Sequence, residues 1–376
     1  MTTARRIYLD NAATSWPKPP AVGEAMLRAL ELGVSYGRGQ SAAGDEVRRT
    51  VDLLRRQLAT LCGLKDPHRV VFTCGGTDGL SMVLRGLLKT GDRVVTSALE
   101  HNSVIRPLRH VAGVEVAAIE LGAEGRSDLE HADTLLSQPT SLVVLTHASN
   151  VTGVEQDVAP IASLAHAAGA VVALDVCQTA GHVAFDVEST GADILIGSGH
   201  KGLRGPLGTG FVAFREGLER LPTPLRFGGT GSRSESSRQP ETLPDRYEAG
   251  SMNVPGLFGL AAAIADFSPD AYSDLTTQLI AGLSEVRGLR VVGPPEGVPR
   301  VPVVSIVAED WDPHDLAAIL EAEAGVETRA GLHCSPHAHQ MLGTLEGGGT
   351  LRFSPGACTT SGDLETVLDA LRRVLG

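Results

Sequence analysis

Five short apolar runs constrain the fold of this chain more than any other feature of its sequence. Each ends in a polar or glycine-rich turn, and none alternates between polar and apolar residues. The runs are Val70–Thr73, Val94–Thr96, Leu142–Thr146, Val171–Leu174 and Ile194–Ile196. Such runs are typical of strands buried on both faces. Helical patterns lie between some of them, so we predict a mainly parallel sheet covered by helices, with ligands bound at the carboxyl ends of its strands.

The second half of the chain has a different character. Residues 228–242 are polar and rich in glycine and serine, and predict a long loop. Apolar periodicity then returns and continues to the end of the chain. The length of 376 residues allows about two or three domains. We expect a large domain over residues 15–265 and a small α+β domain formed by residues 266–376 together with residues 1–14.

Charge and cysteine content exclude several classes of protein. The net charge is −12 without basic runs, which disfavours binding to nucleic acid or to an anionic membrane. No stretch approaches the roughly 20 apolar residues of a membrane span, and residues 1–14 contain no apolar signal core. The five cysteines are dispersed and odd in number, which is unlike a disulfide framework. We therefore expect a soluble protein of the reducing cytoplasm.

Two charged side chains at predicted strand ends indicate a chemistry. Lys201 closes the segment Ser198-Gly199-His200-Lys201, directly after one run, and Asp175 follows another run 26 residues earlier. That distance is one strand–helix–strand unit, so both groups can reach one ligand. A carboxylate and a lysine facing each other fit pyridoxal phosphate, because the acid keeps the pyridine nitrogen protonated and the lysine binds the aldehyde. The ordinary alternatives are a surface position for Lys201, and a helix-capping or metal-ligating role for Asp175.

Three further segments at strand ends are individually weaker signals. Cys74–Gly79 leads from a strand into a helix, where free backbone N–H groups bind phosphate, although Gly-Gly-Thr also makes common turns. In Glu100-His101-Asn102 the imidazole can stack on a ring or transfer protons, or simply be solvated. In Thr146–Asn150 the Asn150 amide can donate a hydrogen bond to a phenolic oxygen.

Together, these segments resemble the class V aminotransferase family of fold-type I pyridoxal-phosphate enzymes. Within it they are most similar to cysteine desulfurases and selenocysteine lyases with a short active-site loop. The resemblance covers nearly the whole chain and is also carried by Tyr8–Ala13, 37–39, Arg246–Ser251, Arg329–Cys334 and Leu351–Ser354. It implies an α/β fold with a mainly parallel, seven-stranded sheet between helices and a smaller α+β domain.

The resemblance also implies a cofactor, pyridoxal 5′-phosphate, and a role for each matching residue. Lys201 would bind the aldehyde and Asp175 the pyridine nitrogen. The other cofactor contacts would come from Gln178 and Asn150 at the ring oxygen, His101 stacked on the ring, and Gly76, Thr77, Ser198 and His200 at the phosphate. Arg352 would bind the substrate carboxylate, with Asn11 a weaker candidate. Ser251 would reach the phosphate of a partner subunit, which implies a homodimer.

Cys334 is the predicted sulfur acceptor. It lies in a loop bounded by glycine and proline, and Arg329 and His333 offer positive charge, which favours a thiolate. The other four cysteines are expected to pack in the interior. The resemblance implies conversion of L-cysteine to L-alanine, with the sulfur held on Cys334 as a persulfide. Cys334 precedes Arg352 by 18 residues, as in short-loop desulfurases that pass sulfur to an acceptor protein.

Several alternatives stay open at this point. His333, Cys334, His337 and His339 could form a zinc-type cluster, although no second ligand pair is apparent and we expect no metal.

Ser41 and Asp78 stand where many relatives have His and Glu, so selenocysteine, cysteine sulfinate or another amino acid could be the substrate. The chain could be another class V lyase, epimerase or transaminase in which Cys334 is a bystander. Residues 37–42 fit a G-x-G-x-x-A dinucleotide motif, but no strand precedes them. A scaffold on an inactive enzyme is the remaining alternative.

Overall fold

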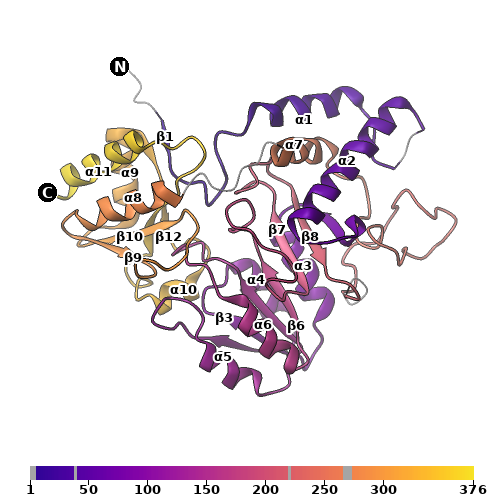
Figure 1. Cartoon of the computed structure of the whole chain (residues 1–376), viewed down its shortest axis with the longest axis horizontal. Helices are drawn as coiled ribbons and strands as arrows, with labels where there is room; N and C mark the ends of the chain where they lie inside the picture. Colours follow the sequence, from indigo (N-terminus) through magenta and orange to yellow (C-terminus); the bar gives the residue numbers. More distant parts are fainter. Residues whose placement is uncertain (1–5, 38–39, 219–221, 266–272) are drawn as a thin grey trace.

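The computed structural model describes residues 6–37, 40–218, 222–265 and 273–376, and it contains a large and a small β-sheet, each with its own helices (Figure 1). The large sheet has seven strands in the order β2-β8-β7-β6-β5-β3-β4. Their bounds are β2 Val70–Thr73, β3 Arg93–Ser97, β4 Glu115–Ile119, β5 Leu142–Thr146, β6 Val171–Asp175, β7 Ile194–Ser198 and β8 Gly210–Phe214. Only β8 runs antiparallel to its neighbours in this sheet. The predicted α/β class and mainly parallel sheet are therefore confirmed.

Alternate residues of the central strands enter two separate hydrophobic cores, one on each face of the large sheet. In β5, Val143 and Leu145 belong to one core, whereas Leu142 and Val144 belong to the other. Helices α2, α5, α6 and α7 cover the first face, and α3 and α4 cover the second. Their bounds are α2 Ala42–Leu61, α3 Gly76–Leu87, α4 Asn102–His110, α5 Leu129–Leu136, α6 Val158–Ala167 and α7 Val254–Ala265. This double burial explains why the strands read as unbroken apolar runs.

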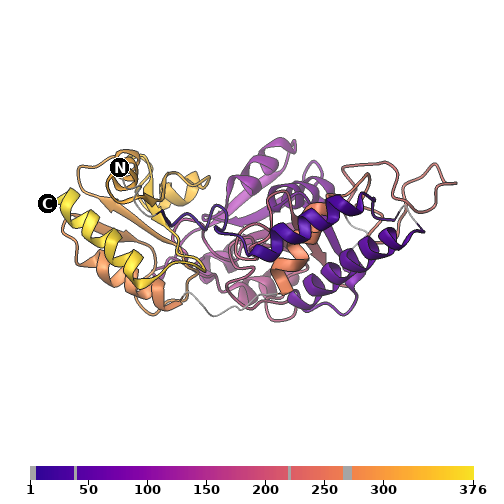
Figure 2. The same ribbon diagram turned by 90° about the horizontal axis from the view of Figure 1, so that it is seen from above.

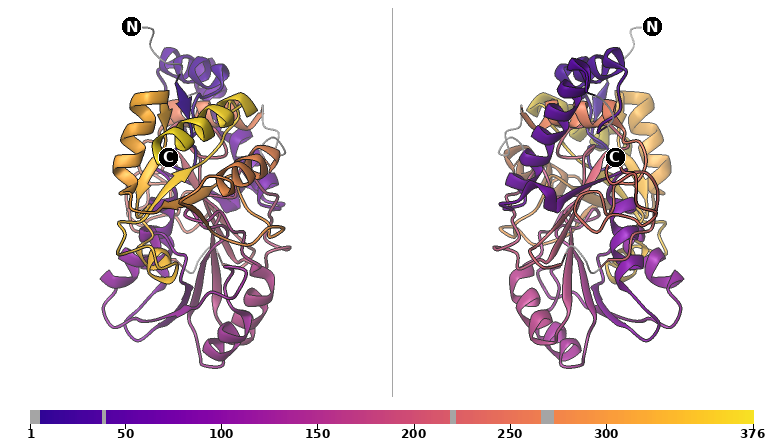
Figure 3. Two further views of the ribbon diagram at one scale, coloured as in Figure 1. Left: turned by 90° about the vertical axis from the view of Figure 1, so that its left-hand side faces the viewer. Right: turned by 90° about the vertical axis from the view of Figure 1, so that its right-hand side faces the viewer.

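The small sheet is antiparallel and has the strand order β12-β13-β10-β9. Its strands are β9 Leu289–Val292, β10 Val304–Ala308, β12 Arg329–Gly331 and β13 Thr350–Phe353. Leucine and valine side chains of α8, α9 and α11 pack on it. These helices span α8 Ser273–Ser284, α9 Pro313–Ala324 and α11 Ser361–Leu375. The left view of Figure 3 shows the molecule from the end that carries α11, which is drawn in yellow.

The N-terminal segment packs with the C-terminal elements beside the small sheet. Strand β1 (Ile7–Tyr8) pairs in parallel with β11 (Val326–Glu327), and Ile7 and Leu9 enter the core of the C-terminal elements. Helix α1 (Pro20–Leu32) instead packs along α7 at the opposite end of the molecule (Figure 2). The expected domain boundary after residue 265 falls on residues 266–272, outside the described residues.

Two short elements, η1 (Pro67–Arg69) and α10 (Pro336–Met341), complete the structure. In the described part of the chain, no helix is both long enough and apolar enough to cross a membrane.

Candidate active site

A cavity of about 250 Å³ lies where the carboxyl ends of the central strands face the C-terminal elements. Thr146, Asp175 and Ser198 end the neighbouring strands β5, β6 and β7 and line this cavity. Helix α3 contributes Gly76 and Thr77 from its first turn. Residues 329–352 close the other side with Arg329, His333, Cys334 and Arg352. The cavity therefore occupies the edge of the sheet at which parallel strands bind ligands.

Lys201 is placed by a tight turn after β7. The Gly199 N–H donates to the Thr209 carbonyl at 2.9 Å, and the Gly205 N–H donates to the Gly199 carbonyl at 2.8 Å. A Cβ atom on Gly199 would lie 2.3 Å from the Thr209 hydroxyl oxygen, so the turn requires glycine there. The register of the parallel strands sets Asp175 opposite Thr146 on one side and Ile196 on the other. Both charged side chains therefore line the same cavity.

The start of helix α3 and the end of β7 form an anion-binding corner. The N-cap is Gly75, with φ +147°, and no side chain caps the helix. Ser198 Oγ and His200 Nδ1 are buried without hydrogen-bond partners. Unpaired buried polar groups are rare and costly, and here they lie beside the free N–H groups of a helix N-terminus. This donor set fits a phosphate group.

His101 caps helix α4 and is held in one tautomer. Its Nδ1 accepts a hydrogen bond from the Ser103 backbone N–H at 3.0 Å, so its remaining proton resides on Nε2. Burial, together with the nearby charge of Lys201, lowers the pKa of His101 to about 4. The Ser103 hydroxyl lies 2.8 Å from the same Nδ1 and 2.7 Å from the Thr77 hydroxyl. Ser103 thus links the anion-binding corner to the imidazole.

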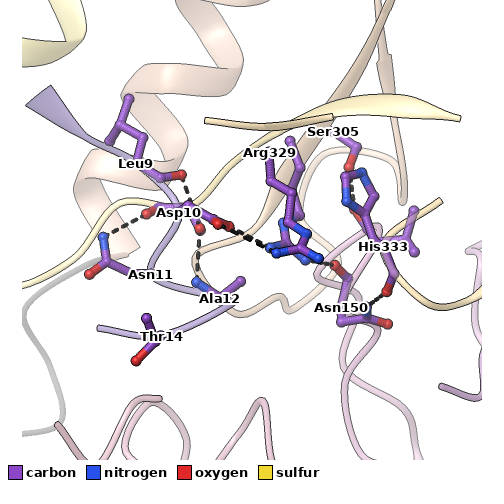
Figure 4. A network of polar contacts seen from close by, with 12 residues as sticks. Leu9, Asp10, Asn11, Ala12, Thr14, Asn150, Ser305, Arg329 and His333 are labelled. Carbon is purple, nitrogen blue, oxygen red and sulfur yellow. Dashed lines mark hydrogen bonds and ion pairs between the residues drawn. The ribbon is translucent and has the colours of Figure 1, made fainter. Parts of the chain in front are cut away.

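Arg352 of β13 forms the opposite wall, and it is only 2% exposed. Its Nη2 donates to Asp10 Oδ1 at 2.6 Å and its Nη1 to the Asn150 carbonyl at 3.0 Å, whereas Nε is buried without a partner. Arg329 points at the same aspartate from β12, with 3.9 Å between Nη1 and Oδ2 (Figure 4). Two guanidinium groups thus share one carboxylate at the cavity.

The loop that carries Cys334 is anchored on several sides. Asn150 Nδ2 donates to the His333 carbonyl at 2.6 Å, and the Ser335 hydroxyl donates to Asn150 Oδ1 at 2.8 Å. The Asn102 N–H donates to the Cys334 carbonyl at 2.7 Å. His333 and Cys334 both have positive φ angles, +48° and +61°, which non-glycine residues seldom adopt. These contacts hold a strained backbone that presents the exposed Cys334 side chain to the cavity.

The comparisons with known proteins agree with this geometry. Residues 7–367 match the sequence family described as Aminotransferase class-V. The chain belongs to this family. A probable cysteine desulfurase from Methanothermobacter thermautotrophicus is 32% identical over 98% of this chain and 95% of the relative. A probable cysteine desulfurase from Synechocystis is 31% identical over 98% of this chain and 91% of the relative.

Solved structures of the same family superpose closely on this chain. An apo cysteine desulfurase from Thermococcus onnurineus matches with a TM-score of 0.89 and 30% identity, over 98% of this chain and 94% of the other. An S-sulfonic acid form of a cysteine desulfurase from Escherichia coli matches with a TM-score of 0.86 and 29% identity over the same shares. The resemblance to class V aminotransferases seen in the sequence is therefore confirmed.

Most residues predicted for the site of this class V family member line one cavity. They are Gly76, Thr77, His101, Asn150, Asp175, Gln178, Ser198, His200, Lys201, Cys334 and Arg352. Two of the predicted residues, Ser251 and Asn11, do not line this cavity. Ser251 is exposed and lies outside the cavity lining, so its expected partner-subunit role stays a prediction. Asn11 donates to the Ser354 carbonyl and accepts from the Trp16 N–H, so its amide holds the N-terminal segment and does not reach the cavity.

Some sequence-based interpretations need correction. Burial lowers the pKa of His333 to about 2, so His333 is uncharged and cannot supply the positive charge expected beside Cys334. Arg329 can still supply the positive charge beside Cys334.

Cys62 and Cys177 are buried as expected, but Cys74 and Cys358 are exposed. His333 and His339 bond to threonine hydroxyls, and no group of three potential metal ligands gathers among the described residues.

Two residues of this site, Asp10 and Ser103, have no role in the sequence-based prediction. Asp10 forms ion pairs with Arg352 and Arg329, and these pairs depend on tertiary contacts. Ser103 follows His101 by two residues, and its hydroxyl at the start of a helix is a signal that could have identified it.

A substitution in the anion-binding corner tests the close packing of helix α3. A Cβ on Gly76 would lie 2.2 Å from Cys177 Sγ, with the next atom at 3.8 Å. Gly76→Ala is therefore expected to reduce the free energy of unfolding by about 1–3 kcal/mol and to weaken cofactor binding. In a Cys177→Ala background most of this loss should disappear, because the clashing atom is gone. Denaturant titrations of the four proteins of this double-mutant cycle measure the coupling.

Gly23 provides the matched control, because nothing lies within 4 Å of a Cβ built at that position of helix α1. Gly23→Ala is expected to stabilise the protein by about 0.5–1 kcal/mol. An equal effect of Gly76→Ala in the presence and absence of the Cys177 thiol would show that the two sites are not in contact.

Proposed function

We propose that this chain is a pyridoxal 5′-phosphate-dependent cysteine desulfurase. In this proposal it converts L-cysteine to L-alanine and holds the released sulfur on Cys334 as a persulfide for transfer to an acceptor. The observation that carries the proposal is the cavity in which an exposed thiol faces Lys201, Asp175 and Arg352. Relatives named probable cysteine desulfurase align over nearly their whole length, which supports the same activity.

The residues present fit the cofactor. Gly76, Thr77, Ser198 and His200 would hold its phosphate, and the unpaired Ser198 hydroxyl and His200 nitrogen support this placement. Asp175 would pair with the ring nitrogen, and Lys201 would bind the aldehyde carbon. When bound, the cofactor supplies an electron sink for the pair left on the substrate α-carbon. His101 would lie against the ring, with its proton on Nε2.

The chain's own residues would carry the other steps. Arg352 binds the substrate carboxylate through its free Nε–H and so fixes the α-carbon near Lys201. The Lys201 amine takes the α-proton. The Cys334 thiolate then attacks the substrate sulfur, so that an S–S bond forms while the C–S bond breaks and its electron pair stays with carbon. Alanine then needs two protons. The Lys201 amine would return the first to the α-carbon, and the proton released by the Cys334 thiol would reach the β-carbon through Lys201 or His101.

The proposal also includes a homodimer and a cytoplasmic location. Leu27 and Leu30 of α1 and Phe227 are large apolar side chains with more than half of their surface exposed, at 62%, 64% and 69%. Apolar exposure of this kind supports a partner surface. Ser251 is exposed too and would reach the partner subunit's phosphate site. The five cysteines are free, as a reducing compartment requires.

The decisive experiment supplies L-cysteine to the protein reconstituted with pyridoxal phosphate. We expect a visible absorption band, alanine as the organic product, and one added sulfur atom on the peptide that contains Cys334. Repeated turnover should require a thiol acceptor. Pyruvate in place of alanine, or alanine without sulfur on Cys334, would overturn the proposal. Alanine from L-selenocysteine but not from L-cysteine would favour a selenocysteine lyase.

A further inference from the structure

The segment between β1 and α1 links the C-terminal elements to the side of the molecule that carries the large sheet (Figure 1). Several of its donors converge on one acceptor, the His200 carbonyl oxygen. They are the Ser15 N–H at 3.0 Å, the Thr14 hydroxyl at 3.1 Å, the Ser15 hydroxyl at 3.2 Å and Lys18 Nζ at 2.8 Å. A carbonyl oxygen has only two lone pairs, so this acceptor is crowded. The N-terminal segment therefore grips the peptide group that precedes Lys201.

The Lys18 ammonium group organises these donors. Its Nζ also donates to the Ser15 hydroxyl at 2.8 Å and reaches the Thr14 hydroxyl at 3.4 Å. Its three N–H bonds therefore face three acceptors. Each hydroxyl accepts from the ammonium group and donates its own hydrogen to the His200 carbonyl. A neutral amine would disturb this arrangement, because its lone pair would take a hydroxyl hydrogen away from that carbonyl.

The charge of Lys18 is not balanced by a carboxylate. In the part of the chain that the structure describes, Lys18 forms no ion pair, and the titratable groups that face it are Arg204 and His200 on the turn after β7. His200 is uncharged near neutral pH, since burial lowers its pKa to about 4. Burial, with a contribution from Arg204, lowers the pKa of Lys18 to about 8. A half-buried cation without a counterion is costly, and such groups gather at functional sites.

The peptide group on the other side of Lys201 is fixed as well. The Arg204 N–H donates to the Lys201 carbonyl at 2.8 Å. Lys201 lines the active-site cavity and also a small cavity whose lining includes Ser15 and Arg204. The N-terminal segment therefore lies directly behind Lys201. A shift of the His200 carbonyl would move the Lys201 amine relative to a substrate in the active-site cavity.

We propose that Lys18 is a positioning residue for Lys201. Its ammonium group, together with the Thr14 and Ser15 hydroxyls, fixes the peptide before Lys201 so that the amine meets the α-proton of the substrate. Lys18 does not line the cavity and acts only through the His200 carbonyl. This inference rests on the proposed function, in which Lys201 takes the α-proton. It predicts that removal of this proton slows when Lys18 loses its charge.

The test follows exchange of the α-hydrogen of L-alanine for solvent deuterium by the holoenzyme, using proton NMR. Lys201 would remove the hydrogen and return a deuteron, so the exchange needs no sulfur chemistry. At about pH 6.5, where Lys18 is charged, Lys18→Met should exchange about tenfold more slowly than the wild type. At about pH 9.5 the wild-type side chain is neutral, so the ratio of the two rates should fall to about twofold. The ratio cancels the titration of groups that both proteins share.

Lys18→Arg tests whether a retained charge rescues the exchange. Its guanidinium stays charged at both pH values, so this variant should remain within about threefold of the wild type at the lower pH and exceed it at the higher pH. Lys65→Met is the matched control, because it removes the same charge from an exposed lysine outside the cavity. We expect its exchange rate to equal that of the wild type at both pH values.

Thermal melting shows whether the variants fold. Because the Lys18 charge is half buried without a counterion, Lys18→Met should melt at the wild-type temperature or above it. Ser15→Ala keeps the inference testable if Lys18→Met does not fold. It removes one donor to the His200 carbonyl and one acceptor of Lys18, so exchange should slow several-fold at the lower pH.

The outcomes separate this inference from the function beneath it. A Lys18→Met rate equal to that of the wild type, or a ratio that does not change with pH, overturns the role of the Lys18 charge. Slower exchange with a lower melting temperature and no rescue by arginine overturns it too, because these results indicate a structural role. Exchange that persists in Lys201→Ala instead overturns the assignment of Lys201 as the base in the proposed function.

Discussion

Replacing Cys334 by serine is expected to reduce alanine formation from L-cysteine about a thousandfold or more, while the cofactor stays bound. A thiolate attacks divalent sulfur readily, whereas an un-ionised hydroxyl does not. The substitution changes one atom in an exposed side chain, and the loop is anchored through the backbone of residues 333 and 334 and the side chain of Ser335. The loop should therefore keep its shape, so a loss of activity reports on the sulfur atom.

The chain provides two thiol controls for this experiment. Cys358 is exposed like Cys334, but it lies outside the active-site cavity. Cys177 lines that cavity, but burial and the charge of Asp175 raise its thiol pKa well above the usual range, so it remains protonated. Neither Cys358→Ser nor Cys177→Ser should prevent persulfide formation. Alanine release at the wild-type rate from Cys334→Ser would show that Cys334 is a bystander.

Much of the large sheet could be predicted from the sequence, because its central strands are buried on both faces. All five predicted runs coincide with strands β2, β3, β5, β6 and β7. Strand β4 could not be found in this way, since it lies at the sheet edge and four of its five residues are at least partly exposed. The direction of β8 also could not be predicted, because antiparallel pairing depends on contacts between distant residues and not on local pattern.

The site residues also fall into those that local sequence pattern could predict and those that depend on contacts between distant residues. Residues at strand ends, such as Asp175 and Lys201, could be predicted to meet because parallel strands end at one edge of a sheet. Asp10 and Arg352 are 342 residues apart, and no local pattern brings them together. The charge of His333 was predicted wrongly for a related reason. Its neutral state follows from burial, which sequence position alone does not reveal.

Replacing Lys201 by alanine should have the largest effect of any single substitution. We expect kcat to fall about ten-thousandfold or more and the visible band of the covalently bound cofactor to disappear. The reason is geometric. Among the described residues, Lys201 is the only lysine that lines the cavity, so no other amine is placed to bind the aldehyde or to take the α-proton.

Lys18 provides the stringent comparison, because it is a lysine that lies close by and is partly buried. Its Nζ donates to the His200 carbonyl and to the Ser15 hydroxyl, both at 2.8 Å, and it does not line the cavity. Burial, with a contribution from Arg204, lowers the pKa of Lys18 to about 8, so a fraction of its amine is neutral near neutral pH and chemically able to bind an aldehyde. Only its position excludes it from the reaction.

Borohydride reduction followed by peptide mapping distinguishes these two lysines. In the wild-type protein and in Lys18→Met, the cofactor should be fixed to the peptide that contains Lys201. In Lys201→Ala no peptide should carry it, although the residues proposed to bind the phosphate can still retain the cofactor without a covalent bond. A reduced cofactor on Lys18 in Lys201→Ala would mean that the turn after β7 can rearrange, and the rigid hydrogen bonds through Gly199 and Gly205 would then not position the catalytic amine.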